Sequence, residues 1–76
     1  MPKLPVVNGR EMIRALQRAG FVLDSQESSH VTMFSPVTGR HATVPVHAAR
    51  DMKTGTVRNV LRQAGLTVEE FHELLK

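Results

Sequence analysis

Hydrophobic side chains recur at intervals of three and four residues between Asn8 and Gly20, which predicts an amphipathic helix. The apolar positions are Met12, Ile13, Leu16 and Ala19. Asn8 and Glu11 have the spacing of a capping box, in which each side chain accepts a hydrogen bond from the other residue's backbone. Gly20 stands where helices commonly end. The polar face carries a basic stripe at four-residue intervals, formed by Arg10, Arg14 and Arg18.

The centre of the chain alternates between polar and apolar residues, which is the period of β-strands. Phe21–Ser25 is predicted to form a short strand, followed by a polar loop over residues 24–29. Its apolar residues on one face are Phe21 and Leu23. Residues 30–35 and 40–47 alternate again, and the Pro- and Gly-containing turn at 36–39 joins them as an antiparallel pair.

One register places every apolar residue of this pair on the same face, as a half-buried sheet requires. Its cross-strand pairs are Phe34–His41, Met33–Ala42, Val31–Val44 and His30–Pro45. Thr43 and His47 then become diagonal neighbours of His30, at about 7–8 Å. Because Pro45 has no N–H to donate to a ladder, we expect its strand to lie at a sheet edge.

Two further helices are expected after a linker over residues 50–55. The first has apolar residues at helical spacing, at Val57, Val60, Leu61 and Ala64, and ends at Gly65. The second begins at Thr67, where Glu70 completes another capping box. Its apolar face consists of Val68, Phe71, Leu74 and Leu75.

The predicted fold class is therefore α+β, with the order helix, three antiparallel strands, helix and short helix, in a single domain over residues 1–76. We expect the helices to cover one face of the sheet. The open face then carries His30, Thr32, Thr43 and His47.

Composition narrows the classes of function. The chain contains no cysteine, which excludes disulfides, thiolate metal sites and cysteine nucleophiles. It shows neither a signal-peptide pattern nor an apolar run long enough for a membrane span, so we expect a cytoplasmic protein. The aromatic residues are three phenylalanines, and we expect the open sheet face to lack aromatics. Any RNA would then be recognised by shape and phosphate contacts, without stacked bases.

Charge is distributed unevenly along the chain. Residues 1–68 contain nine Lys and Arg against four Asp and Glu, a net charge of +5, whereas residues 69–76 carry a net charge of −2. A basic body with an acidic tail fits an anionic partner such as a nucleic acid. The alternative is a solvated surface with a chance excess of arginine.

His30 is the leading candidate for chemistry, because it lies where a polar loop enters a strand, on the face that the core does not need. An imidazole exchanges protons near neutral pH, and RNA cleavage requires one proton from the ribose 2′-OH and one for the leaving 5′-oxygen. The alternative is an exposed histidine without a role.

The other histidines do not predict a metal site. His41 and His47 are six residues apart on one strand, about 20 Å, which is too far to share an ion. His72 lies among glutamates, and we expect it to be solvated surface. The sequence predicts neither a metal nor a cofactor.

A phosphate site is predicted where Lys53-Thr54-Gly55-Thr56 precedes the second helix, because free N–H groups, a lysine and hydroxyls meet there. Arg58 and Arg62 follow at one-turn spacing. Plain helix capping is the alternative. Residues 57–75 also resemble a helix-turn-helix. The second helix carries three glutamates and no arginine, so we expect no direct DNA binding.

Several short segments, in their order and spacing, resemble the HicA toxin family. They are Gly9-Arg10-Glu11, Ala19-Gly20-Phe21, Ser29-His30, Thr38-Gly39-Arg40, Val44-Pro45-Val46-His47, residues 53–58 and Gln63-Ala64-Gly65-Leu66-Thr67. The resemblance implies a fold like the double-stranded-RNA-binding domain. It also implies a messenger-RNA endoribonuclease that acts without metal and is held inactive by a HicB-type antitoxin in a hetero-oligomer.

The family's catalytic histidine follows a Gly-Ser pair, and by position it falls on His30. Ser28 stands where the family usually has glycine, so a turn that needs φ > 0 would be strained here. We expect His30 to act as general acid or base, with Ser29, Lys53, Thr54 and Arg58 contacting RNA and His47 structural. The alternatives are a non-catalytic double-stranded-RNA-binding module and an interaction protein without RNA affinity.

Overall fold

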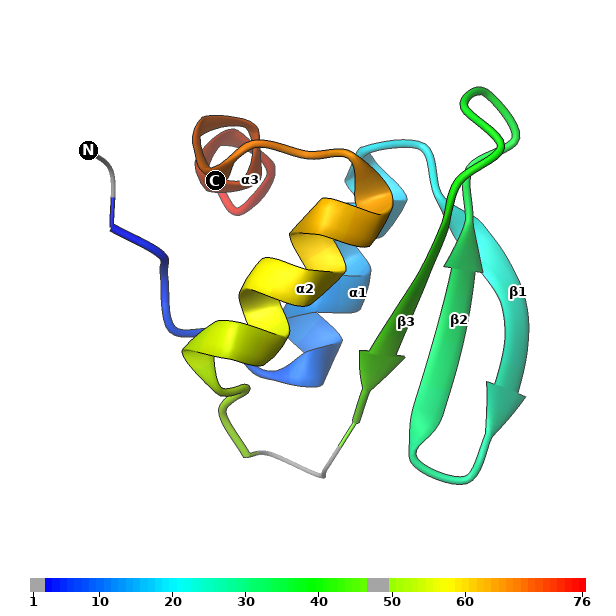
Figure 1. The fold of residues 1–76 in the computed structure, drawn as a ribbon, viewed down its shortest axis with the longest axis horizontal. Coiled ribbons are helices and arrows are strands. Elements are labelled where there is room, and N and C mark those ends of the chain that lie inside the picture. Colours follow the sequence, from blue (N-terminus) through cyan, green and yellow to red (C-terminus); the bar gives the residue numbers. More distant parts are fainter. Residues whose placement is uncertain (1–2, 47–49) are drawn as a thin grey trace.

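The computed structural model describes residues 3–46 and 50–76 (Figure 1). The elements along the chain are α1 (Gly9–Arg18), β1 (Val22–Glu27), β2 (His30–Phe34), β3 (His41–Pro45), α2 (Thr54–Ala64) and α3 (Val68–Leu74). This α+β order confirms the predicted fold class. No helix within the described ranges is both long and apolar enough to cross a bilayer.

Both predicted capping boxes are present. The Glu11 N–H donates to Asn8 Oδ1 at 2.9 Å, and the Asn8 N–H donates to Glu11 Oε1 at 3.0 Å. Thr67 and Glu70 exchange the same two hydrogen bonds at the start of α3, at 3.1 and 2.9 Å. Each pair satisfies N–H groups that a helix start leaves without intrahelical partners, which explains why these helices begin where the sequence indicates.

The sheet has the strand order β1-β2-β3, and β2 and β3 pair in the predicted register. His30 lies opposite Pro45, and Phe34 lies opposite His41. β3 is an edge strand, as Pro45 predicts. Its outer side is covered by α2, because Gln63 Oε1 accepts a hydrogen bond from the Thr43 N–H at 2.9 Å.

β1 corrects the sequence prediction. The strand continues to Glu27, so the predicted loop over residues 24–29 is wrong for its first four residues. A bulge between Leu23 and Ser25 shifts the register there. Phe21 is buried before the strand begins, whereas the Leu23 side chain is 58% exposed, so the two do not share a buried face. All six residues of β1 are exposed, and hydrogen bonding to β2 forms the strand without any apolar alternation.

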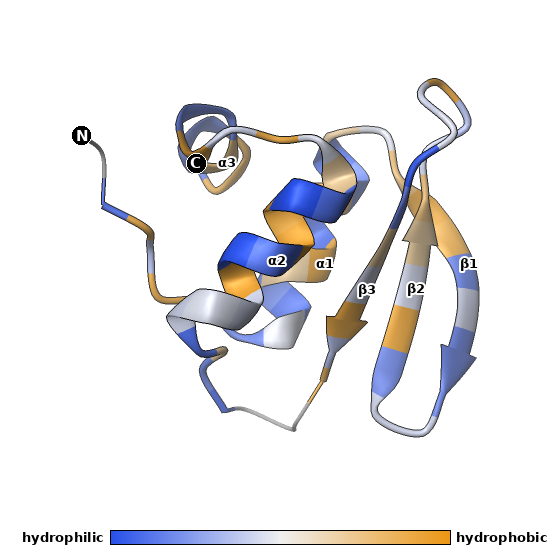
Figure 2. Ribbon diagram, viewed as in Figure 1, coloured by the Kyte–Doolittle hydropathy of each residue, from blue (hydrophilic) through white to orange (hydrophobic). Residues whose placement is uncertain are grey.

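The core lies between the helices and one face of the sheet (Figure 1). β2 alternates between polar and apolar residues along its length (Figure 2). The apolar side chains that β2 and β3 turn toward the helices are Val31, Met33, Ala42 and Val44. Phe71 of α3 is fully buried, which holds this short helix against the rest of the core. The opposite sheet face is left open, as expected.

Two side chains, one from the basic stripe and one predicted to be solvated surface, make contacts with the two ends of the chain. Arg18 Nη1 donates to the carbonyl oxygens of Leu74 and Lys76, at 2.7 and 2.8 Å. Arg18, at the end of the basic stripe, therefore holds the end of α3. His72 Nε2 donates to the Lys3 carbonyl oxygen at 2.7 Å and is partly buried. The interpretation of His72 as free surface is wrong.

Candidate functional site

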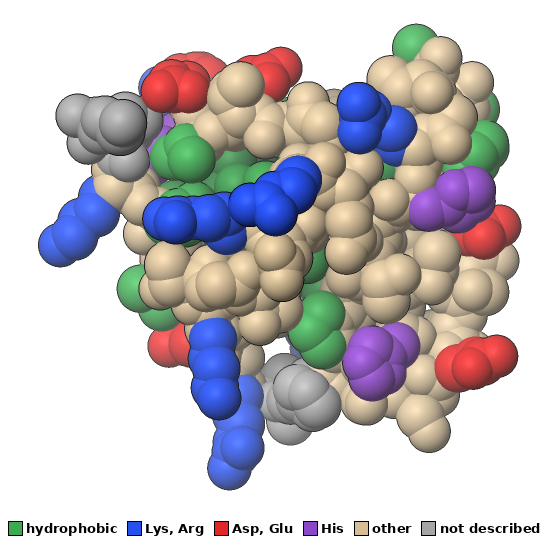
Figure 3. Space-filling model, in the orientation of Figure 1, with side chains coloured by type: hydrophobic (Ala, Val, Ile, Leu, Met, Phe, Trp, Pro, Cys, Tyr) green, Lys and Arg blue, Asp and Glu red, His purple; other side chains and the backbone are tan. Residues whose placement is uncertain are grey.

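His30 is the first residue of β2 and is exposed on the open sheet face. Histidine side chains are visible over the strands in Figure 3. The tight turn that precedes His30 is fastened to β3, because the Ser29 carbonyl accepts a hydrogen bond from the Val46 N–H at 2.6 Å. Within the described part of the chain, the imidazole has no hydrogen-bond or ion-pair partner.

The turn has an unusual backbone at Ser28, whose φ is 49°. Among the described residues, Ser28 is the only non-glycine residue with a positive φ. This is the position at which the family resemblance expects glycine, so the turn does require the conformation that glycine adopts most easily. Serine adopts it at a cost of about 1–2 kcal/mol.

Glu27 is a neighbour of His30 that the sequence analysis missed. The two residues are direct partners across β1 and β2, so their Cβ atoms lie on the same face at about 5 Å. The carboxylate of Glu27 therefore lies on the side of His30 that faces away from β3. The pairing was hidden because all six residues of β1 are exposed, so the strand has no apolar alternation to reveal it. His47, the predicted diagonal neighbour, lies outside the described residues.

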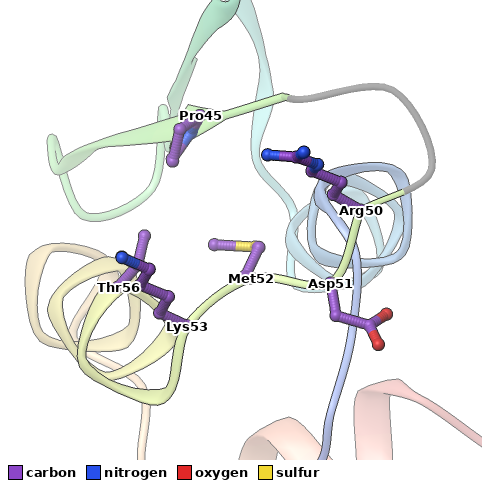
Figure 4. A pocket seen from close by; sticks show the side chains of 6 residues that line it. All are labelled: Pro45, Arg50, Asp51, Met52, Lys53 and Thr56. Atoms are coloured by element: carbon purple, nitrogen blue, oxygen red, sulfur yellow. The ribbon is translucent and has the colours of Figure 1, made fainter.

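A pocket of about 380 Å³ opens between the end of β3 and the start of α2 (Figure 4). Its lining consists of Pro45, Arg50, Asp51, Met52, Lys53 and Thr56. Pro45 connects the pocket with His30, since it lines the pocket and is also the cross-strand partner of that residue. Arg50 and Met52 point into the hollow, whereas the Asp51 carboxylate points away (Figure 4). The pocket therefore offers two cationic side chains, Arg50 and Lys53, and shares one residue, Pro45, with the strand pair that carries His30.

The N-terminal segment holds both walls of this pocket. The Met52 N–H donates to the Val7 carbonyl at 2.8 Å, and Asn8 forms an isolated antiparallel bridge with Asp51. On the other wall, a Cβ added to Gly9 would lie 3.0 Å from the Pro45 carbonyl oxygen. Glycine is needed there because α1 starts directly against the backbone of β3.

The predicted phosphate-binding residues do not all come together. Lys53 is the N-cap of α2 and makes no side-chain capping hydrogen bond, so it leaves the first N–H groups of that helix uncapped. Lys53 lines the pocket, whereas Thr54 is exposed at the helix start outside the lining. Gln63 marks the side of α2 that faces β3. Arg58, five residues earlier, is rotated by about 140° from that side and lies outside the pocket.

The expectation that the open face lacks aromatics is wrong. Phe34 lies on this face and its ring packs against His41, with a centroid distance of 4.8 Å and an interplanar angle of 42°. Asp24 Oδ2 lies 3.8 Å from His41 Nε2. The period-two alternation that directs Val31 and Met33 inward directs Phe34 outward, so the signal was present in the sequence.

The profile of a family described as the HicA toxin of bacterial toxin–antitoxin matches residues 9–66. The chain belongs to the HicA toxin family. The match spans α1, the whole sheet and α2, and it includes His30, Pro45 and Lys53. Membership of the HicA family assigns the chain the role of the toxin in a toxin–antitoxin pair. No protein among the curated sequences compared matches the chain.

Proposed function

We propose that this HicA-family toxin is a metal-independent endoribonuclease that cleaves messenger RNA, with His30 as general acid or base. The observation that supports the proposal most directly is the position of His30. It is exposed, makes no side-chain bond to the described residues, and lies opposite Pro45, which lines a pocket that also contains Arg50 and Lys53. An imidazole in such a place can meet a phosphodiester without first breaking a protein contact.

Cleavage of RNA through its 2′-hydroxyl moves two protons. One leaves the 2′-oxygen as that oxygen attacks phosphorus, and one reaches the 5′-oxygen as the P–O bond breaks. His30 exchanges one of these protons. Cations beside the phosphate stabilise the charge that accumulates on the non-bridging oxygens, and Lys53 and Arg50 in the pocket are suited to this role. Ser29, Thr54 and Arg58 contact the RNA backbone further from the reaction.

Purified protein and a purified messenger-RNA transcript test this proposal, in buffer containing a chelator. We expect wild type to cleave and His30→Ala to lose about 100- to 10,000-fold in rate, the usual contribution of a general acid or base. Lys76→Gln, at the opposite end of the chain, is the matched control and should cleave as wild type does. RNA binding without cleavage by wild type would identify a non-catalytic RNA-binding module instead.

The partner we propose is a HicB-type antitoxin that presents an acidic surface to His30 and the cationic pocket. Covering both features with one surface blocks the reacting group and the phosphate site together. Hydrogen exchange of the complex should show protection of the amides around the Ser28–Ser29 turn, and affinity should rise at low salt. A complex that leaves His30 open to solvent would contradict this mode of inhibition.

A further inference from the structure

An aromatic pair stands at the end of the open face that is furthest from His30. The Phe34 ring is partly buried, and the His41 side chain, 55% exposed, packs on it in a tilted arrangement. Between this pair and His30 lie Thr32 and Thr43, whose hydroxyl oxygens are 3.5 Å apart. The open face is therefore a polar strip with an imidazole at one end and a stacking surface at the other.

The β1 bulge helps to hold this surface in place. Asp24 is the extra residue of the bulge, and bulges commonly redirect a side chain. Its carboxylate lies 3.8 Å from His41 Nε2, an ion pair when His41 is protonated. His41 therefore has contacts on two sides, with the Phe34 ring and with Asp24. A ring with such contacts loses little conformational freedom when a further planar group stacks on it.

Charge around the strip sets the direction in which a nucleic acid can lie. Asp and Glu side chains are found along the β1 edge, whereas Lys and Arg side chains lie over α2 (Figure 3). Arg40 extends the cationic side to the β3 edge beside His41. A Cβ added to Gly65 would lie 2.8 Å from Arg40 Nε, so this side chain crosses the end of α2. Phosphates are therefore favoured along β3, with bases turned toward the sheet.

We propose that Phe34 and His41 form a subsite that stacks one base of a single-stranded RNA whose cleaved phosphate lies at His30. The inference rests on the proposed function, because it places the reacting phosphate at His30. His30 and Phe34 are four residue steps apart along β2, about 13 Å, so the stacked base belongs to a neighbouring nucleotide. Bases held by aromatic stacking must be unpaired, which makes single-stranded RNA the ligand of this face.

The test uses full-length His30→Ala protein, which binds without cutting, and a short fluorescein-labelled single-stranded RNA of mixed sequence. Fluorescence anisotropy gives the affinity. Phe34→Leu keeps the apolar volume and removes the π face, and we expect it to weaken binding about tenfold. His41→Gln should also weaken RNA binding. Val37→Ala is the control, since Val37 is 88% exposed in the turn at 36–39. Circular dichroism and thermal melting establish that each variant is folded.

The outcomes separate this subsite from the proposed cleavage. Equal affinity of folded Phe34→Leu and its parent overturns the subsite, as does a duplex of the same sequence that binds as tightly as the single strand. If wild type cleaves RNA while Phe34→Leu cleaves with the same kcat/KM, the subsite fails and the endoribonuclease assignment stands. If binding depends on Phe34 but wild type never cleaves, the subsite stands and the catalytic assignment fails.

Discussion

The carbonyl oxygen of Ser29 accepts a hydrogen bond from the Val46 N–H at 2.6 Å, which fastens the turn before His30 to the end of β3. The same stretch of β3 contributes Pro45 to the cationic pocket. Together with the β2–β3 pairing, this backbone contact sets the position of the proposed catalytic imidazole relative to the proposed phosphate site. Perturbations of the turn or of the end of β3 are expected to change activity without touching His30 itself.

Ser28→Gly should stabilise the protein. Serine at φ 49° is strained by about 1–2 kcal/mol, and glycine relieves this strain. The greater freedom of glycine in the unfolded chain offsets about 0.5–1 kcal/mol of the stabilisation. The net effect raises Tm by a few degrees in a domain of this size. Thermal melting measures it, with Ser29→Gly as control, since Ser29 has no positive φ and glycine there should lower Tm. A Ser28→Gly protein that melts below wild type would show that the turn is not strained.

Gly9→Ala should destabilise the protein and displace the pocket wall. The added Cβ would lie 3.0 Å from the Pro45 carbonyl oxygen and 3.1 Å from Val46 Cγ2, so backbone must move at a cost of about 1–3 kcal/mol. Urea unfolding measures the loss of stability, and the cleavage rate should fall with it. The control is Gly55→Ala, whose Cβ meets nothing within 4 Å in α2, and which should be neutral or stabilising.

Arg18→Gln should lower stability by about 1 kcal/mol and leave RNA affinity unchanged. The substitution removes the guanidinium that donates to the Leu74 and Lys76 carbonyls. These two hydrogen bonds are charge-assisted and lie in an exposed setting. Arg14→Gln removes the same charge from the same helix without such bonds, so its unfolding midpoint should stay near that of wild type. Equal loss of stability in both variants would assign the effect to charge, not to the clamp on α3.

Lys53→Gln should weaken RNA binding and flatten its dependence on salt. Each phosphate contact releases counterions, so losing one reduces the slope of log affinity against log salt by about 0.7 for a single strand. Anisotropy titrations across a salt series, in the His30→Ala background, measure the slope. Lys76→Gln changes the charge by the same amount at residue 76, beyond α3, and should leave the slope unchanged. An unchanged slope for Lys53→Gln would remove Lys53 from the phosphate site.

The order of elements and the β2–β3 register follow from local patterns. Only one pairing places the apolar residues of the two strands on one face, namely Val31, Met33, Ala42 and Val44. Each capping box, at Asn8 and at Thr67, lies within four consecutive residues and can be recognised from the sequence. The prediction ended β1 too early, at Ser25, because the polar, exposed residues that follow have no such pattern. Its last residues are held in a strand by β2, and this pairing is not encoded in their hydropathy.

The site was predicted less completely than the fold, because several of its contacts join residues far apart in sequence. Arg18 is 56 residues from Leu74, and His72 is 69 residues from Lys3, so no local pattern shows that these side chains are engaged. The orientation of Phe34, in contrast, was available from strand alternation. The direction in which Arg58 points follows only from the contact of Gln63 with β3, which the sequence does not show.

The central claim is that His30 is the group through which this toxin destroys RNA. Induced expression in a bacterial host tests it directly, with growth and bulk messenger-RNA integrity followed at equal levels of soluble protein. We predict that wild type and His72→Gln, a histidine variant away from the sheet, arrest growth with loss of messenger RNA, and that His30→Ala does neither. Equal arrest and equal RNA loss in all three would contradict the role of His30.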